Sequence, residues 1–147
     1  MKKVAILGKL DTKRKAPFNN PEWDIWAFNY HEEQLPRITQ WFDIHAKGAN
    51  PCADIKREDF PFEECEALVG GQYFNNTVSY LIAYAILKGY EEIAFYGMKF
   101  NAEHEKRRNG EYQNVRELIF FAKSRGIKVS APFDKEILTQ YPLYGAE

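Results

Sequence analysis

Two histidines stand where catalytic bases are often found, close to the ends of predicted strands. Asp43 and His45 are two positions apart, so their side chains project from one face of a strand, where the imidazole could act as a general acid or base. The alternative is a strand-end histidine that only hydrogen-bonds its neighbours. His104 lies between Glu103 and Glu105 in a polar stretch, where it could be a base on a lid over the substrate or an exposed loop residue.

The helix predicted between Asn75 and Gly89 offers a place for an anion at its start. Apolar residues recur inside it at helical spacing, and Gly89 can end it in a left-handed cap. Side-chain oxygens of Asn75, Asn76 and Thr77 can accept hydrogen bonds from the free N–H groups of the first turn. The same N–H groups and the helix dipole attract phosphate. We therefore predict ligand contacts from Asn76 and Thr77, with helix capping as the structural alternative.

Four more residues at predicted strand ends are candidates for contact with a nucleotide. Gly8 follows a buried strand, where a backbone without Cβ either allows close approach of a phosphate or only makes a turn. Asn29 could read a base or ribose, or cap a following helix. Gly97 ends a third strand, and Lys99 just beyond it would favour a phosphate.

The order of the predicted elements favours one α/β domain over residues 1–147. Buried strands are expected at 4–7, 24–29, 41–45, 66–69, 92–96 and 127–129, with helices after Asn75 and around 115–122. Strands that alternate with helices predict a mostly parallel, Rossmann-like sheet with helices on both faces. The carboxyl ends of its central strands would form a crevice, which is where open α/β sheets bind ligands.

Composition narrows the classes of partner. Twenty basic and twenty-one acidic residues leave a net charge of −1, without the basic surplus of a nucleic-acid-binding protein. No apolar run of about 18 residues and no leader pattern is visible, so we expect no membrane partner and a cytoplasmic location. Cys52 and Cys65 are predicted to be free thiols. The histidines lack metal-ligand spacing and no dinucleotide or P-loop fingerprint follows Gly8, so we predict no metal and no cofactor.

Four blocks of the sequence resemble small proteins found widely in tailed bacteriophages and prophages. They are APFNNPEWDIWAFN, LPRITQWFDIH, YFNNTVSYLIAYAILKGYEEIAFYGMKF and NVRELIFFAKSRGIKVSAP, in that order. The block from Asn75 to Phe100 also resembles bacterial sialyltransferases of the Campylobacter type and, similarly, archaeal 6-hydroxymethylpterin diphosphokinase-like proteins. These resemblances imply a Rossmann-like sheet with a nucleotide bound at its carboxyl edge.

The sialyltransferase resemblance also implies roles for particular residues. Gly8, Asn29, and Asn76 with Thr77 match the positions that contact the donor nucleotide in that family. The family's catalytic histidine and paired tyrosines have no clear match in this sequence. His104 and Tyr112 are candidates because they follow the strand expected at 92–96, as the catalytic residues do in that family. The resemblance therefore implies nucleotide binding more directly than sugar transfer.

Three functional hypotheses follow from the sequence. The first is a nucleotide- or nucleotide-sugar-binding protein that transfers a glycosyl or phosphoryl group, with His45 or His104 as base. The second is a protein that sequesters a nucleotide without turnover. The third is an interaction module with a vestigial crevice, in which aromatic residues such as Tyr141 and Tyr144 belong to a homo-oligomer interface.

Overall fold

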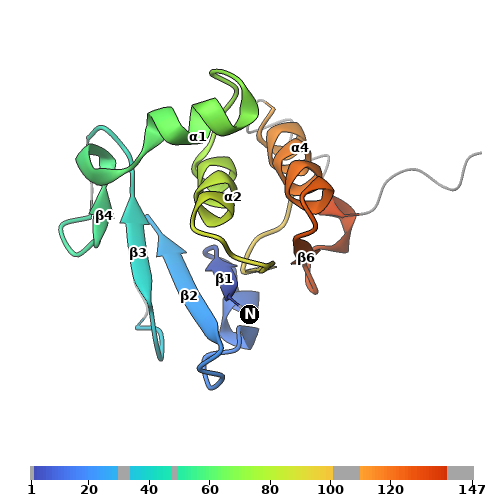
Figure 1. The fold of residues 1–147 in the computed structure, drawn as a ribbon. Helices are drawn as coiled ribbons and strands as arrows, with labels where there is room; N and C mark the ends of the chain where they lie inside the picture. Colours follow the sequence, from blue (N-terminus) through green and yellow to red (C-terminus); the bar gives the residue numbers. More distant parts are fainter. Residues whose placement is uncertain (1, 30–33, 48–49, 101–109, 139–147) are drawn as a thin grey trace, which may run out of the picture.

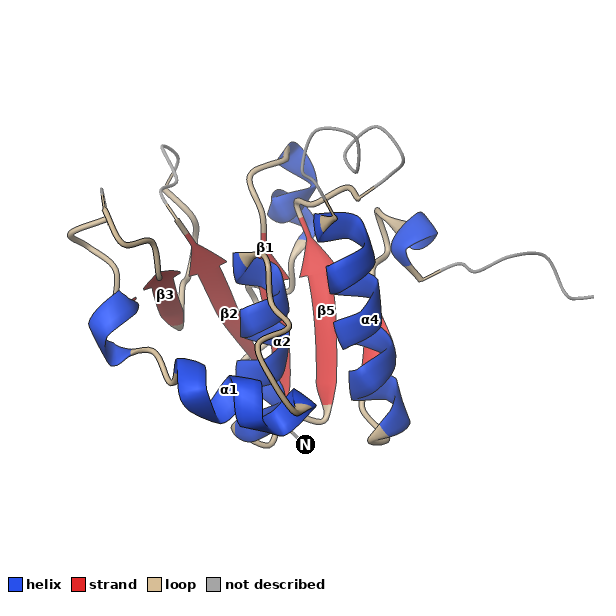
Figure 2. Ribbon diagram, turned by 90° about the horizontal axis from the view of Figure 1, so that it is seen from above, coloured by secondary structure: helices blue, strands red, loops and turns tan. Residues whose placement is uncertain are grey.

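The fold is built on one parallel sheet of six strands. The computed structural model describes residues 2–29, 34–47, 50–100 and 110–138. The strands lie in the order β4-β3-β2-β1-β5-β6, and every neighbouring pair is parallel. Their bounds are β1 Lys3–Leu7, β2 Trp23–Phe28, β3 Gln40–Asp43, β4 Ile55–Lys56, β5 Glu92–Tyr96 and β6 Lys128–Ser130. Figure 2 shows the strands pointing the same way, so their carboxyl ends share one edge. The predicted α/β fold is confirmed.

Among the described residues, three α-helices lie together on one side of this sheet, as Figure 1 shows. They are α1 (Phe62–Val69), α2 (Thr77–Leu87) and α4 (Glu111–Ser124). The same part of the chain also contains three short 3-10 helices, η1 (Asp11–Lys15), η2 (Arg57–Asp59) and η3 (Lys135–Ile137). The other side of the sheet is covered, within the described ranges, by η1 and the coil around it.

The strand predicted at 66–69 is wrong, because these residues form the second half of α1. That helix begins at Phe62, and its first turn carries Glu63 and Glu64, which suit the positive end of the helix dipole. Gly70, with φ 89°, ends it in a left-handed cap. The stretch between β3 and this helix contains β4 and η2, and the stretch between β1 and β2 contains η1. Short apolar runs alone do not separate a strand from one turn of helix.

The larger core lies between the α-helices and the sheet. Val4, Ile6, Ile93 and Phe95 of the two central strands point into it. They pack against α2, of whose eleven residues seven are buried. Trp26 is fully buried at its centre. Ring centroids of Phe42, Tyr84 and Tyr90 lie 5.0, 5.5 and 5.1 Å from that of Trp26. Aromatic residues make up 16% of the chain, and many of them pack in this core.

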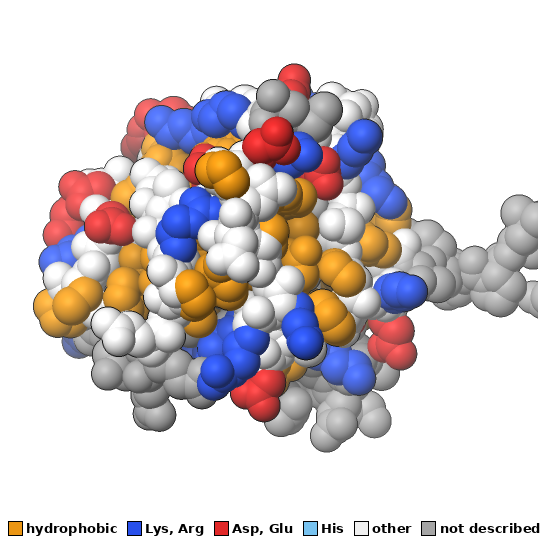
Figure 3. All heavy atoms as spheres, turned by 90° about the horizontal axis from the view of Figure 1, so that it is seen from below, with side chains coloured by type: hydrophobic (Ala, Val, Ile, Leu, Met, Phe, Trp, Pro, Cys, Tyr) orange, Lys and Arg blue, Asp and Glu red, His pale blue; other side chains and the backbone are white. Residues whose placement is uncertain are grey.

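The opposite face carries a smaller core. Ala5, Leu7 and Ile25 are fully buried there beside Ala16, with partly buried rings and Leu35 around them. The ring of Phe133 lies against that of Tyr96 at this face and is 44% exposed. Figure 3 shows that, seen from below, hydrophobic side chains reach the surface among those of Lys and Arg. The thin cover of η1 leaves this face more open than the face under the α-helices.

The chain reverses its direction across the sheet between β1 and β5. From β1 it moves outward through β2, β3 and β4, and then α1 and α2 bring it back to β5 on the other side of β1. Gly8 and Gly97 end these two strands, and their backbones touch. A Cβ on Gly8 would lie 2.3 Å from the carbonyl oxygen of Gly97 and 2.4 Å from Cγ of Met98. A side chain is therefore excluded at position 8.

We expect Gly8→Ala to destabilise the fold by about 1–3 kcal/mol, as overpacking of a closed contact does. Gly126→Ala is the matched control, because its Cβ would meet nothing within 4 Å and only its φ of +83° is unfavourable, at about 1 kcal/mol. Urea unfolding of both variants measures the difference. Equal stability of Gly8→Ala and the unaltered protein would contradict the contact.

Candidate functional site

The candidate site is a cavity of about 780 Å³ at the carboxyl edge of the sheet. Its walls come from the segments that follow β1, β2, β3 and β5, together with η2 and the start of α2. The structure brings seven of the predicted site residues to its lining, namely Gly8, Asn29, His45, Asn76, Thr77, Gly97 and Lys99. His104 lies outside the described residues, so its predicted role as a base on a lid stays a prediction. Residues distant in sequence thus share one space of a size typical for small ligands.

His45 is held by a buried carboxylate. Its ring Nδ1 lies 2.8 Å from Oδ1 of Asp43, and its backbone N–H donates to the same oxygen at 3.2 Å. The Asp43 side chain is 4% exposed, whereas that of His45 is 55% exposed. A carboxylate at Nδ1 fixes the proton there, which leaves Nε2 of the neutral ring as a proton acceptor. This is the arrangement of an oriented general base.

The ionised state of Asp43 is maintained by its hydrogen bonds. Burial raises the pKa of Asp43, but N–H donors from Asn50 and His45 and the His45 ring outweigh it, so the pKa is lowered from 3.8. The strongest of these contacts is the Asn50 backbone N–H, 2.7 Å from Oδ2. A charged carboxylate can therefore keep the imidazole oriented at neutral pH.

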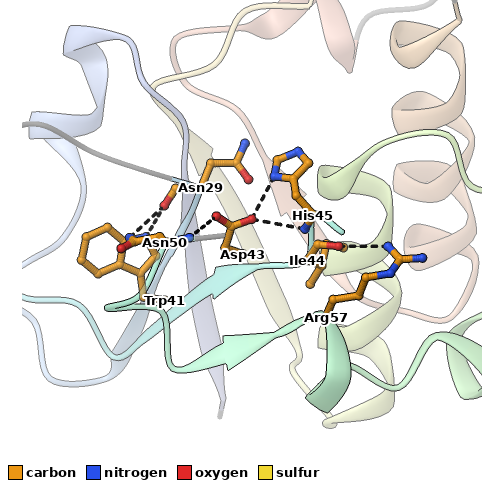
Figure 4. A network of polar contacts seen from close by, with 7 residues as sticks. All are labelled: Asn29, Trp41, Asp43, Ile44, His45, Asn50 and Arg57. Atoms are coloured by element: carbon orange, nitrogen blue, oxygen red, sulfur yellow. Dashed lines mark hydrogen bonds and ion pairs between the residues drawn. The ribbon is translucent and has the colours of Figure 1, made fainter. Parts of the chain in front are cut away.

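Asn29 is tied to the same network and faces the cavity. Its backbone carbonyl accepts hydrogen bonds from the indole of Trp41 and, at 3.5 Å, from the side chain of Asn50. Figure 4 shows its amide on the side where the His45 ring lies. Asn29 has φ 61°, a left-handed conformation that asparagine adopts more readily than most residues. Its buried Oδ1 has no hydrogen-bond partner among the described residues, which suits an acceptor reserved for a ligand donor.

At the start of α2, the two residues predicted to contact the ligand, Asn76 and Thr77, have different surroundings. Asn76 is the N-cap, because its Oδ1 accepts from Ser79 N at 2.9 Å and its amide donates to Ser79 Oγ, Asn75 and Asn114. Asn114, buried in α4, also accepts from Asn75 N at 3.0 Å and so fixes the turn. The structural alternative for Asn76 is thus realised. The Thr77 hydroxyl has no hydrogen-bond partner within the described part of the chain, and Thr77 borders the cavity.

Several lining residues were missed by sequence reasoning. Phe74 and Tyr80 stack with ring centroids 4.2 Å apart, and Phe62 meets Tyr80 edge-on at 5.0 Å. Burial and the neighbouring Glu66, whose Oε1 accepts a hydrogen bond from the Tyr80 hydroxyl at 3.2 Å, raise the pKa of Tyr80 to about 12. Arg57 lines the cavity from η2. The aromatic residues resembled core, and Arg57 lay in a stretch without periodicity, so no local signal pointed to them.

Comparison with known proteins adds a structural neighbour. No family model matches the chain, and no curated protein sequence matches it. Among solved structures, the sialyltransferase CST-II in complex with a trisaccharide acceptor and CMP has a TM-score of 0.54 and 14% identity. The match covers 96% of this chain and 86% of the neighbour. At this identity the likeness shows the fold alone, a Rossmann-like α/β sheet. Among the described residues, no helix is long and apolar enough to cross a membrane.

We expect the Asp43 carboxylate to contribute stability that disappears in acid. Its pKa is lower in the folded than in the unfolded chain, so this contribution is fully present above about 3.8 and is lost as the pH falls through the folded value. At pH 7, Asp43→Asn should lose about 1–3 kcal/mol, since buried donors lose a charged acceptor. Denaturant unfolding from pH 7 to pH 2 measures the gap, which is the difference in free energy of unfolding between Asp43→Asn and the unaltered protein.

The gap between Asp43→Asn and the unaltered protein should narrow below pH 3.8. Asp59→Asn, an exposed change in η2, controls for the removal of one negative charge. A gap that stays constant down to pH 2 would contradict the role given to the carboxylate.

Proposed function

We propose that this protein binds a nucleotide or nucleotide sugar in the cavity and, as an enzyme, transfers a glycosyl group, with phosphoryl transfer as the variant of the same site. One observation carries the proposal: an oriented imidazole, an unpartnered Asn29 oxygen and the start of α2 all face one cavity beside the reversal point of the sheet. The fold shared with a sialyltransferase supports it. The phage-type relationship, a homo-oligomeric state and the cytoplasmic location remain predictions from the sequence.

The phosphate of the nucleotide would lie at the start of α2. The Asn76 side chain satisfies the N–H of Ser79, while no hydrogen bond within the described residues uses the N–H groups of Thr77 and Val78. With the positive end of the helix dipole, these donors favour an anion. Lys99, exposed after β5, borders the same space and adds positive charge. Asn29 would accept a hydrogen bond from the base or ribose.

His45 would act on the acceptor. In glycosyl transfer, an acceptor hydroxyl oxygen bonds to the anomeric carbon of the donor, the bond from that carbon to the phosphate oxygen breaks, and the nucleotide leaves with its electron pair. The hydroxyl proton passes to Nε2 of His45. The proton on Nδ1 of His45 stays on the ring and remains hydrogen-bonded to Asp43. The buried carboxylate then stabilises the imidazolium that forms.

Thr77→Arg should abolish nucleotide binding, because the longer side chain fills the cavity at the start of α2. The measurement is a thermal-shift screen with nucleoside phosphates and nucleotide sugars, in which a ligand at 100 times its dissociation constant adds about 2.7 kcal/mol of stability. Gln113→Arg, exposed near the start of α4, is the matched control and should keep the shift. A panel without any shift, or a shift that Thr77→Arg retains, would overturn the proposal.

His45→Ala should lower turnover by about 10²–10⁴-fold while ligand binding is retained, which is the range for a lost general base. The assay uses the nucleotide sugar that gives the largest thermal shift and follows release of the nucleotide. Lys47→Ala, an exposed change two positions away, should leave the rate unchanged. Tight binding with the ligand recovered intact from the unaltered protein would instead favour sequestration without turnover.

A further inference from the structure

A second hollow adjoins the cavity at the η2 end. It has a volume of about 450 Å³, and its lining consists of His45, Ala46, Lys56, Arg57, Glu58 and Phe62. Four of these residues, namely His45, Ala46, Arg57 and Phe62, also line the main cavity. The two spaces therefore meet at the imidazole proposed as the base, and a group bound in the hollow would lie next to the reacting atoms.

Arg57 is pre-organised at this junction. One guanidinium nitrogen donates to the carbonyl of Ile44 at 3.1 Å, and the guanidinium carbon lies 4.9 Å from the centroid of the Phe62 ring. These two contacts fix the plane of the group. The other guanidinium N–H donors have no hydrogen-bond partner within the described residues. A planar fork of free donors matches the two oxygens of a carboxylate or a phosphate.

The charges around Arg57 also favour an anion. Lys56 lines the same hollow, and Glu58 is the single acidic side chain of its described lining. His45 becomes positive when it accepts a proton. Glu58 is exposed, so its carboxylate can point to solvent instead of into the hollow. The described lining of the hollow therefore carries two basic side chains against one acidic side chain.

The hollow does not extend to the start of α2, where the nucleotide phosphate is placed. None of Asn76, Thr77 and Val78 is part of its lining. A nucleotide with its phosphate at the start of α2 would leave the hollow open for another part of the reacting pair.

We propose that this hollow is a subsite for an anionic group, a carboxylate or phosphate carried by the sugar next to His45, and that Arg57 binds it. The inference rests on the proposed function for its place in a reaction, although anion binding by Arg57 can be measured without it. The anionic sugar is either the acceptor or the group attached to the nucleotide. The shared chemistry is a fixed guanidinium on two oxygens.

The test compares a neutral sugar with anionic sugars, and a nucleotide with and without an attached anionic sugar. Binding of glucose, glucuronate and glucose 6-phosphate is measured by NMR titration, both with and without CMP, and binding of CMP and CMP-N-acetylneuraminic acid is measured by calorimetry. We expect the unaltered protein to bind at least one anionic sugar tenfold or more tightly than glucose, as a charge-assisted bidentate contact provides. In Arg57→Gln this preference should fall to near one.

Two further variants keep the test decisive. Arg125→Gln is the matched control, since that arginine also lies 4.9 Å from a phenylalanine ring, at the end of α4, and it should leave the preference unchanged. Arg57→Lys keeps the charge but loses the fork, so we expect an intermediate preference and a melting temperature close to that of the unaltered protein. If Arg57→Gln does not fold, Arg57→Lys against Arg125→Gln still decides.

Each outcome has a definite reading. Loss of free anionic-sugar binding in Arg57→Gln assigns the anion to the acceptor, whereas weaker CMP-N-acetylneuraminic acid with unchanged CMP assigns it to the donor. Equal binding of glucose and both anionic sugars, together with equal binding of CMP and CMP-N-acetylneuraminic acid, would overturn the subsite. A preference that survives in Arg57→Gln would also overturn it. Absence of CMP binding would count against the proposed function alone, because the sugars are also titrated without CMP.

Discussion

The contact between the backbones of Gly8 and Gly97 is the constraint on which the site depends. Gly8 N–H donates to the carbonyl of Tyr96 at 2.8 Å, and Leu10 N–H donates to that of Gly97 at 2.9 Å, so the ladder between β1 and β5 continues past the strand ends. The Thr12 hydroxyl accepts from Gly97 N at 3.0 Å and anchors η1 there. This closes the sheet beneath the cavity. The glycine that a phosphate site would require is here required first by packing.

The second constraint is the buried carboxylate of Asp43, which connects two side chains that face the cavity. One oxygen holds the imidazole of His45, and the other accepts from Asn50, whose own side chain reaches the carbonyl of Asn29. Asn29 is thereby kept in a left-handed conformation with its amide toward the open space. Such strain persists only where neighbours determine the backbone firmly. The network joins the proposed base and the proposed ligand acceptor in one hydrogen-bonded unit.

The sequence predicted the parts of the fold whose signals are local. The apolar runs before Gly8 and Gly97 and the periodic helix after Asn76 lie where they were expected, because buried parallel strands and a capped helix have strong patterns. The strand at 66–69 was wrong because its apolar run is the end of a helix whose start carries charges. A strand through both residues predicted that His45 lies near Asp43, and the contact forms although β3 ends at Asp43. The contacts of Asn50 with Asp43 and Asn29 depend on how the loop after β3 folds back.

The distribution of charge explains why composition said so little about the site. The whole chain carries a net charge of −1, yet the described lining of the main cavity contains Lys9, Arg57 and Lys99 against Glu111. A cleft with low-dielectric walls concentrates the field of such residues, and the start of α2 adds its dipole in the same direction. The net charge of the whole chain is therefore informative about a broad nucleic-acid-binding surface, because such a surface needs many basic residues. A single phosphate and one carboxylate need only two positive points, such as the start of α2 and Arg57 in this cavity.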